Sequence, residues 1–357
     1  MGIIVTKFGG SSLANADRFK QVLSIMQALE NRRCVVLSAP GVYKCKPKVT
    51  TLLSEAWQRY ASHTNCSEYI EIIARRYDDI GRQLNVRGMK DQALQSIHSA
   101  LTISEAHVLS RGEYLCARLF SEFSGVPMCD AALLLAFRQD GKLDLSLTLR
   151  QLADAIDSSV KMIIPGFYGA DATGRIRTLP RNGSDITGAL AAAACNAELY
   201  ENWTDVSGMM TADPSIVPEA QSIPQISYRQ MRKLAIAGAK VLHPDCLAPV
   251  EECGIPVRLC NTFHPNHPGT LICESDAPQI SCLIMKNGPT ITDTETTAIS
   301  LFGAKPSMIA DLRHMKGVIS IKANEEPCVV IVPRGEAHAY ARKLHSLLIN
   351  NKELPLF

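Results

Sequence analysis

The sequence predicts an α/β protein with a parallel-rich open sheet covered by helices, followed by a smaller α+β domain. Three observations support this prediction. Strands and helices alternate from the N-terminus with a spacing of roughly 30 residues, a long helical stretch interrupts the strands, and the composition shifts near 273–281. A chain of 357 residues is long enough for two domains of ~150 residues each.

The first expected element is an apolar strand over residues 2–8. Small residues at 9–12 form a turn, and a helix is expected over about 15–30 because Phe19, Val22, Leu23, Ile25 and Met26 recur on one face. The run CVVLSA at 34–39 is the second strand. The order strand, turn, helix, strand favours a parallel sheet.

A helical lobe is expected over about 50–125, after a basic, proline-containing loop at 40–50. The remaining elements of the first domain follow in chain order: strands within 126–132 and 161–169, an alanine-rich helix over 184–196, a strand within 198–206, two helices around Gly238 within 214–254, and a strand within 255–262.

The last segment, 281–357, predicts the order strand, helix, strand, strand, helix. The sequence runs that predict these five elements, in order, are TAISLFG, PSMIADLRHM, GVISIKA, CVVIVP and EAHAYARKLHSLLI. This order is most of a ferredoxin-like unit, with the last strand missing or unrecognisable. We therefore expect domains at 1–275 and 281–357.

Composition excludes several classes of function. A net charge of +2 argues against a dedicated nucleic-acid binder. No apolar run approaches the ~18 residues that span a bilayer, and the N-terminus lacks the apolar core of a signal peptide. The 12 cysteines form no C-x-x-C pair and lie mostly in apolar runs, which indicates buried thiols in a reducing, cytoplasmic location. No membrane or nucleic-acid partner is expected.

The first candidate site is the turn after the first strand, where Lys7 precedes Gly9, Gly10 and Ser11. Glycines let backbone approach a ligand closely, and exposed N–H groups at a helix N-terminus bind anions. Lysine adds a point charge suited to phosphate. The sequence is not a Walker A motif. Glycine–serine turns are also common for purely structural reasons, so this pattern alone leaves both interpretations open.

The second candidate is Arg181-Asn182-Gly183-Ser184-Asp185, directly before the alanine-rich helix. Arginine pairs bidentately with a carboxylate, and aspartate suits a metal or a proton. The alternative is a plain capping loop, because serine and aspartate are frequent N-caps.

Three further motifs carry polar groups at expected turns or helices. Thr204 and Asp205 end an apolar strand, where open α/β sheets bind ligands, although an ordinary strand-end turn has the same residues. Lys240 and Val241 lie in a Gly/Ala-rich stretch, where the lysine could also extend to solvent. Glu113 follows a glycine inside the helical lobe and could face an amine, although a solvated glutamate is common there.

Together these motifs resemble one family, the aspartate kinases. KFGGSS, VVLSAPG, SRGEY, IPGFYG, RNGSDITGA, ENWTDVSG, ADP and GAKVLHP occur in the family's order and at similar spacing, over roughly 1–273. The resemblance implies an amino-acid-kinase fold and an ACT-type regulatory tail. It implies transfer of a phosphoryl group from MgATP to the β-carboxylate of L-aspartate, giving 4-phospho-L-aspartate, the first step towards lysine, threonine and methionine. It also implies a homodimer.

The resemblance also implies roles for individual residues. Lys7 would neutralise the transferring phosphoryl group and Asp185 would organise the lysine or the metal. The other implied contacts divide by ligand: for the substrate, Thr50, Glu113, Arg181, Asn182, Gly183 and Ser184; for the nucleotide, Lys7, Gly9, Gly10, Ser11, Thr204, Asp205, Met210, Ser215, Lys240 and Val241. Mg²⁺ would arrive with ATP, with no direct protein ligand assigned.

The chain departs from the family pattern at several places. Asn182 replaces a glycine, Ser215 replaces a phosphate-contacting arginine, and Met210 replaces a tyrosine near the adenine. Only one degenerate ACT-like unit fits after 281, where the family commonly carries two. Two alternatives therefore stay open: a kinase of another amino acid or small acid on the same fold, and a non-catalytic regulatory homologue.

Overall fold

The computed structural model describes residues 2–156, 160–180, 182–239, 242, 244–274, 280–286, 295–323 and 326–350. The chain divides into two compact units: unit 1 is Met1–Val206 with Asp245–His267, and unit 2 is Ser207–Pro244 with Pro268–Phe357. These limits differ from the expected boundary near 275–281. The physical reason is that Ala212 and Val217 pack into the hydrophobic core of the C-terminal sheet.

Unit 1 contains five parallel strands in the order β11-β7-β1-β2-β4. Their bounds are β1 Ile4–Phe8, β2 Arg32–Leu37, β4 Met162–Pro165, β7 Leu199–Thr204 and β11 Val257–Asn261. Every residue of β1 is buried, so both faces of the central strand are covered. Parallel sheets are buried in this way because their crossover helices pack on both faces.

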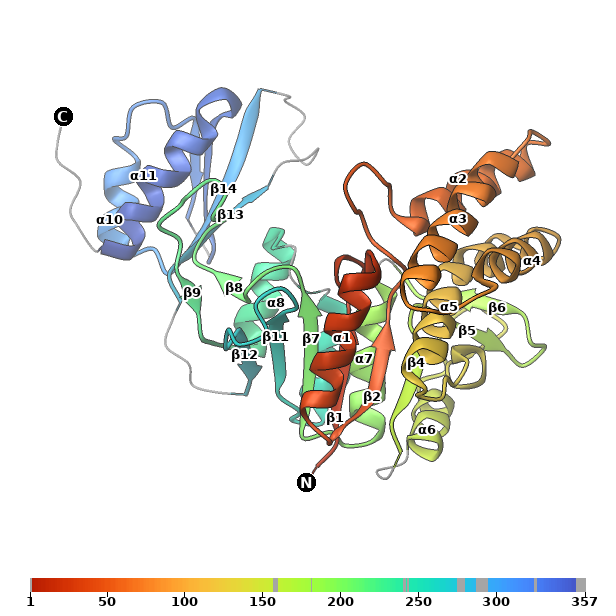
Figure 1. Cartoon of the computed structure of the whole chain (residues 1–357). Helices are drawn as coiled ribbons and strands as arrows, with labels where there is room; N and C mark the ends of the chain where they lie inside the picture. The colour runs from red at the N-terminus through yellow and green to blue at the C-terminus, as the bar shows by residue number, and fades with distance from the viewer. Residues whose placement is uncertain are drawn as a thin grey trace. The chain divides into compact units, whose positions relative to one another are not determined.

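Strand register determines which side chains face which helix. Lys7 lies beside Asn202, while Phe8 lies beside Trp203, in the parallel pairing of β1 with β7. Because successive side chains point to opposite faces, Lys7 and Asn202 share one face and Phe8 and Trp203 share the other. Helix α7, Gly183–Ala194, contacts β1, β2 and β7, and α1, Ala16–Ala28, also packs on β2 (Figure 1).

The expected helical lobe is confirmed. It consists of four helices, α2 Val49–Ala61, α3 Ser67–Gln83, α4 Met89–Leu101 and α5 Glu105–Ser124 (Figure 1). Their apolar faces share one core with α1. Helix α5 begins where the Ser104 side chain accepts the N–H of His107, and it ends at Gly125, whose φ of 73° suits glycine.

The expected strand over 126–132 is wrong. Met128 makes only an isolated bridge to Ile163, and the chain then turns into a 3-10 helix at Ala131–Leu133. The Asp130 side chain caps this turn by accepting the N–H of Ala132. The local capping aspartate therefore overrides the apolar run. A three-stranded sheet follows, formed by β3 Ala136–Phe137, β5 Tyr168–Asp171 and β6 Ile176–Thr178, with α6 at Leu145–Ala155.

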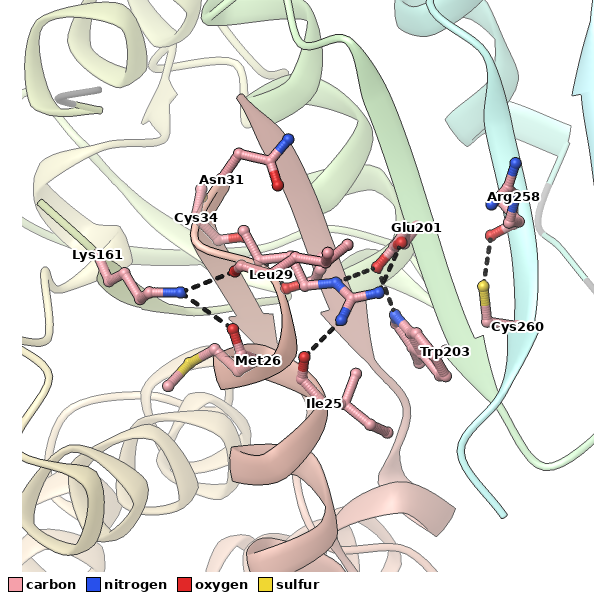
Figure 2. Close-up of polar contacts among 12 residues, drawn as sticks. Ile25, Met26, Leu29, Asn31, Cys34, Lys161, Glu201, Trp203, Arg258 and Cys260 are labelled. Atoms are coloured by element: carbon pink, nitrogen blue, oxygen red, sulfur yellow. Dashed lines mark hydrogen bonds and ion pairs between the residues drawn. The ribbon is translucent and has the colours of Figure 1, made fainter. Parts of the chain in front are cut away.

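A buried ion pair crosses the α1-facing side of the sheet (Figure 2). Arg32 on β2 donates to both carboxylate oxygens of Glu201 on β7, at 2.8 and 3.0 Å. Trp203 Nε1 donates to the same carboxylate at 2.9 Å, and Arg32 also donates to the Ile25 carbonyl. All the oxygens of the pair are satisfied, as a buried charge pair requires.

Unit 2 is built on a four-stranded antiparallel sheet in the order β13-β14-β16-β15. The bounds are β13 Cys282–Lys286, β14 Thr296–Phe302, α10 Pro306–Leu312, β15 Ser320–Lys322, β16 Cys328–Pro333 and α11 Ala337–Asn350. The predicted order from β14 to α11 is confirmed. The sheet has its fourth strand after all: β13 lies beside β14 and precedes the motif in the sequence.

The remaining described elements of unit 2 lie outside this sheet. They are β8 Met209–Met210, β9 Ser222–Ile223, β10 Gln225–Ser227, α8 Tyr228–Ala237 and β12 Thr270–Cys273. Strand β8 pairs with β9, and β10 pairs with β12 in parallel. A capping box between Ser227 and Gln230 starts α8. Thr211 hydrogen-bonds His345 of α11 at 2.9 Å, and Leu283 of β13 donates to the Thr211 carbonyl, so the segment after β8 is held against the C-terminal sheet and helix.

Candidate active site

The centre of the candidate site is an ion pair between Lys7 and Asp185. Lys7 Nζ lies 2.5 Å from Asp185 Oδ1, and both side chains are about nine-tenths buried. Asn202 donates from Nδ2 to the same oxygen at 3.0 Å, and the Tyr200 hydroxyl donates to the Asp185 carbonyl. Lys7 and Asn202 reach Asp185 together because their register places both on the α7-facing side.

The glycine turn follows directly from the strand that carries Lys7. Gly9, Gly10 and Ser11 are half-buried, whereas Ser12 is fully buried. A Cβ at Gly10 would lie 2.7 Å from the Ala39 carbonyl, and one at Gly41 would lie 2.6 Å from the Gly10 carbonyl carbon. Only glycines let these two loops pass each other so closely. The turn then leads into the 3-10 helix Gly10–Leu13.

The N-terminus of α7 contributes the second loop of the site. Asn182 lies at φ 62°, a left-handed conformation that asparagine tolerates, and this conformation explains how it stands where a glycine is usual. Ser184 is buried, and a Cβ at Gly166 would lie 2.7 Å from both its Cβ and its Oγ. Asp185 lies in the first turn, where the helix dipole favours a carboxylate. Arg181 lies outside the described residues.

Glu113 lies buried in the middle of α5, and its carboxyl group is only partly hydrogen-bonded. The backbone N–H of Ala39 donates to it, yet its Oε2 has no hydrogen-bond partner among the described residues. Burial raises the pKa of this carboxyl to about 8. A buried acid with a free oxygen is suited to receive a cationic group such as an ammonium.

Gly112 and Ala39 bring the start of α2 next to Glu113. A Cβ at Gly112 would meet Ala39 Cβ at 2.9 Å and Val49 Cγ1 at 3.6 Å. Thr50, the next residue after Val49, is half-buried in the first turn of α2. Thr50, Glu113 and the loop around Ala39 therefore belong to one neighbourhood.

Arg76 of α3 holds the loop that leads to Thr50. Its guanidinium is buried and donates to the carbonyls of Pro47, Ala14 and Gly41. Burial lowers the pKa of this arginine. The three carbonyls belong to different segments, so Arg76 fixes the loop by bonding backbone oxygens from each of them.

The nucleotide-side predictions fall in different parts of the chain. Thr204 is half-buried at the end of β7 and donates to Asp205 Oδ1 at 3.1 Å, while Asp205 is exposed. Met210 and Ser215 belong to unit 2, where Met210 lies in β8 and Ser215 is exposed with its hydroxyl donating to Asp213. Lys240 and Val241 lie outside the described residues.

Two residues near these loops had no role in the sequence analysis. Phe167, directly after Gly166, has a φ of 80°, which is strained for an aromatic residue. Its N–H donates to Thr187 and its carbonyl accepts from Leu179, so the α7 loop imposes the strain. Thr262 follows β11 and hydrogen-bonds Ser12 of the glycine turn. The IPGFYG motif could have drawn attention to Phe167, whereas no local signal marks Thr262.

The chemistry available here is charge neutralisation and positioning. The site has a buried lysine held by an aspartate, a glycine turn beside that lysine, and a buried carboxyl able to take an ammonium. Phosphoryl transfer requires these functions more than a side-chain nucleophile. Across the described ranges, no group of three or more His, Cys, Asp or Glu side chains could hold a metal ion. A divalent cation that arrives with a nucleotide would meet the Asp185 carboxylate, which carries the negative charge of the Lys7–Asp185 pair.

The fold and this site define the class, and comparison with known proteins gives the same one. Residues 2–261 match the model of the amino acid kinase family, and the chain belongs to that family. It is 32% identical to aspartokinase 3 of Bacillus subtilis, covering 75% of this chain and 63% of that protein. It is 32% identical to the aspartokinase of Rickettsia felis, covering 91% of this chain and 75% of that protein. Within the amino acid kinase family, the chain therefore belongs to the aspartokinases.

Solved structures agree with the sequence relatives. The crystal structure of aspartate kinase from Clostridium acetobutylicum has a TM-score of 0.83 at 25% identity, covering 97% of this chain and all of that one. The structure of Escherichia coli aspartokinase III with aspartate and ADP has a TM-score of 0.71 at 26% identity, covering 93% of this chain and 78% of that one. Separately, no helix among the described residues is long and apolar enough to cross a membrane.

Proposed function

We propose that this chain is an aspartate kinase, which transfers the γ-phosphoryl group of MgATP to the β-carboxylate of L-aspartate. The observation that carries this proposal is the Lys7–Asp185 pair beside the glycine turn, in a chain with aspartokinase relatives. One of those relatives was solved with aspartate and ADP bound. The products are 4-phospho-L-aspartate and ADP, and the step opens the route to lysine, threonine and methionine.

The transfer needs no covalent enzyme intermediate. A β-carboxylate oxygen of aspartate forms the new bond to the γ-phosphorus, and the bond from that phosphorus to the β–γ bridging oxygen breaks as ADP leaves. The attacking carboxylate is already ionised near pH 7 because its pKa is about 4. The enzyme's contribution is to bring two anionic groups together, which requires fixed positive charge and oriented N–H groups.

In this proposal Lys7 supplies the fixed charge and Asp185 holds it. Gly10 and Ser11 direct backbone N–H groups to the phosphates, and Gly9, whose own N–H donates to the Trp203 carbonyl, lets the backbone approach them closely. Glu113 receives the substrate ammonium, which gives its unpartnered Oε2 a hydrogen-bond partner. The remaining assignments keep the roles that the resemblance implies: Thr50, Arg181, Asn182, Gly183 and Ser184 for aspartate, and Thr204, Asp205, Met210, Ser215, Lys240 and Val241 for the nucleotide.

The C-terminal sheet and its helices are proposed to be a single ACT-like domain, which supports a homodimer. The strand order with β13 beside β14 gives the complete four-stranded sheet of a ferredoxin-like unit. We also propose a reducing, cytoplasmic location, because none of the twelve cysteines, all of which lie within the described residues, forms a disulfide.

The test is release of ADP by the purified protein with MgATP, alone and with each of a panel of amino acids. Turnover that requires L-aspartate and is lost in Lys7→Ala supports the proposal. Turnover with a different acceptor makes the chain a kinase of another acid. No turnover with any acceptor, in a folded protein that still binds a ligand, contradicts catalysis and indicates a regulatory homologue.

A further inference from the structure

Thr262 lies where the glycine turn, the end of β7 and α1 meet, although no motif marks it. It follows β11, is fully buried, and belongs to unit 1 with the glycine turn. Its hydroxyl lies 2.6 Å from the hydroxyl of Ser12, which is also fully buried. Its N–H donates to the Thr204 carbonyl at 2.9 Å, and its carbonyl accepts from Gln21 of α1 at 2.5 Å.

These bonds close a ring through the two nucleotide-side segments. Gly9 donates to the carbonyl of Trp203, and Ser12 donates to the carbonyl of Gly9. Thr204 follows Trp203 in β7 and accepts from Thr262, which returns to Ser12 through its hydroxyl. The glycine turn is thus fixed to the end of β7 at both of its ends, directly at Gly9 and through Thr262 at Ser12.

The backbone bonds of Thr262 do not depend on its side chain, but the bond to Ser12 does. A buried hydroxyl pair excludes water, so the Ser12 hydroxyl has no substitute partner once the Thr262 hydroxyl is gone. The 3-10 helix Gly10–Leu13 has a Gly9 cap with no side-chain hydrogen bond, so it lacks a local device that would fix its direction. The long-range bond from Thr262 supplies that constraint.

We propose that Thr262 is a positioning residue that aims the Gly9–Ser12 turn at the phosphates of the nucleotide. The proposal rests on the proposed function, since it assumes that the turn binds phosphate. Thr262 touches neither substrate nor nucleotide and acts through Ser12. Small misplacements of phosphate-binding groups are costly because transfer depends on alignment.

The test compares Thr262→Val, which removes the hydroxyl at nearly constant shape, with Thr262→Ser, which keeps it. We expect Thr262→Val to raise the Kd for MgADP, measured calorimetrically, and to lower kcat/KM for MgATP, each by about tenfold. The KM for aspartate stays within about twofold, because the Glu113 neighbourhood does not depend on this bond. Thr262→Ser restores both nucleotide values.

Two controls separate positioning from general destabilisation. Thr148→Val removes another fully buried threonine hydroxyl in unit 1, which bonds the Ala136 backbone away from the glycine turn; it is expected to leave both nucleotide values unchanged. Ser12→Ala is expected to match Thr262→Val, and the double variant to be no worse than either single one. An additive double variant, an equal defect in Thr148→Val, or unchanged MgADP binding in Thr262→Val overturns the proposal.

The two proposals fail in different ways. If the wild type binds MgADP but shows no aspartate-dependent turnover, the proposed function fails, and the Kd series alone decides the role of Thr262. If the wild type turns over aspartate and Thr262→Val matches it in both nucleotide values, the positioning role fails and the kinase assignment stands. A wild type with neither MgADP binding nor turnover overturns both.

Discussion

Lys7 Nζ lies 2.5 Å from Asp185 Oδ1, with the two side chains 10% and 9% exposed. The lysine comes from the second-last residue of β1 and the aspartate from the first turn of α7, so the pair joins strand to helix at the glycine turn. Asn202 completes the arrangement from β7. The pair holds the lysine ammonium at a fixed place, which is what stabilisation of a developing charge requires.

Lys7→Met is expected to lower kcat for aspartate-dependent ADP release by about 100- to 1,000-fold, as for loss of one fixed transition-state contact. It also leaves the Asp185 carboxylate buried without its cation, so the thermal midpoint falls. Adding Asp185→Asn removes that lone charge and recovers part of the midpoint, while activity stays low. Lys20→Met, at an exposed lysine 4.0 Å from Asp17, is the matched control. A Lys7→Met enzyme with normal kcat would falsify the assigned role.

Arg76→Met is expected to raise the KM for aspartate by about tenfold, because the loop to Thr50 loses its shared anchor. The buried guanidinium bonds the carbonyls of Pro47, Ala14 and Gly41, and methionine cannot replace those bonds. Steady-state kinetics with aspartate varied at saturating MgATP measures the effect. Arg82→Met on the same helix, where the arginine is exposed, serves as the control and keeps the wild-type KM. Equal KM values for the two variants contradict the anchoring role.

The main strands and helices could be predicted because hydrophobic periodicity, turn residues and helix caps are all local features of the sequence. The strand ending at Phe8, the glycine turn and the alanine-rich helix that begins near Ser184 each have their own sequence signal. Non-local contacts were beyond those rules. The pairing of Asn202 with Asp185 depends on the register of β7 against β1, and the Ser12–Thr262 bond joins residues 250 positions apart. A short window of sequence therefore carries no signal for either contact.

Two of the errors in element assignment have different origins. The run at 126–132 has apolar residues typical of a strand, but Asp130 caps a 3-10 turn there instead. Strand β13 was missed because five residues between 282 and 286 look like a strand only when β14 pairs beside them. The Glu113 titration likewise follows from burial, since sequence alone gives a helical glutamate with an ordinary pKa.

Glu201→Leu is expected to destabilise the protein by about 3–5 kcal/mol, because it leaves Arg32 buried without its carboxylate. The double variant Arg32→Met/Glu201→Leu recovers most of that loss, since an apolar pair of similar volume tolerates burial. Midpoints of urea unfolding at pH 7 measure both effects. The control is Arg75→Met, at an exposed pair with Glu71, where solvent screens the interaction and little stability is lost. A double variant as unstable as Glu201→Leu contradicts this account of the pair (Figure 2).

The raised pKa of Glu113 predicts that the free energy of unfolding falls as pH rises. Its pKa is about 8 in the folded chain against a usual 4.5, so between those values the folded state holds a proton that the unfolded state has lost. Stability therefore decreases across this window and levels off above it, by on the order of a few kcal/mol in total. Glu113→Gln mimics the protonated acid and removes this dependence. Thermal midpoints from pH 5 to 9 measure the difference, and parallel curves for wild type and variant contradict the buried-acid assignment.

The same carboxyl predicts how aspartate binding responds to pH. An ammonium against Glu113 requires the ionised carboxylate, so binding below pH 8 releases a proton and the KM for aspartate falls as pH rises towards 8. Each pH unit below that value raises the KM by up to about tenfold, until another group titrates. In Glu113→Gln the KM is high and nearly independent of pH over the same range. The KM for MgATP, measured in the same assays, is the internal control because Glu113 faces no phosphate in the proposed site. A pH-independent aspartate KM in the wild type would show that the ammonium binds elsewhere.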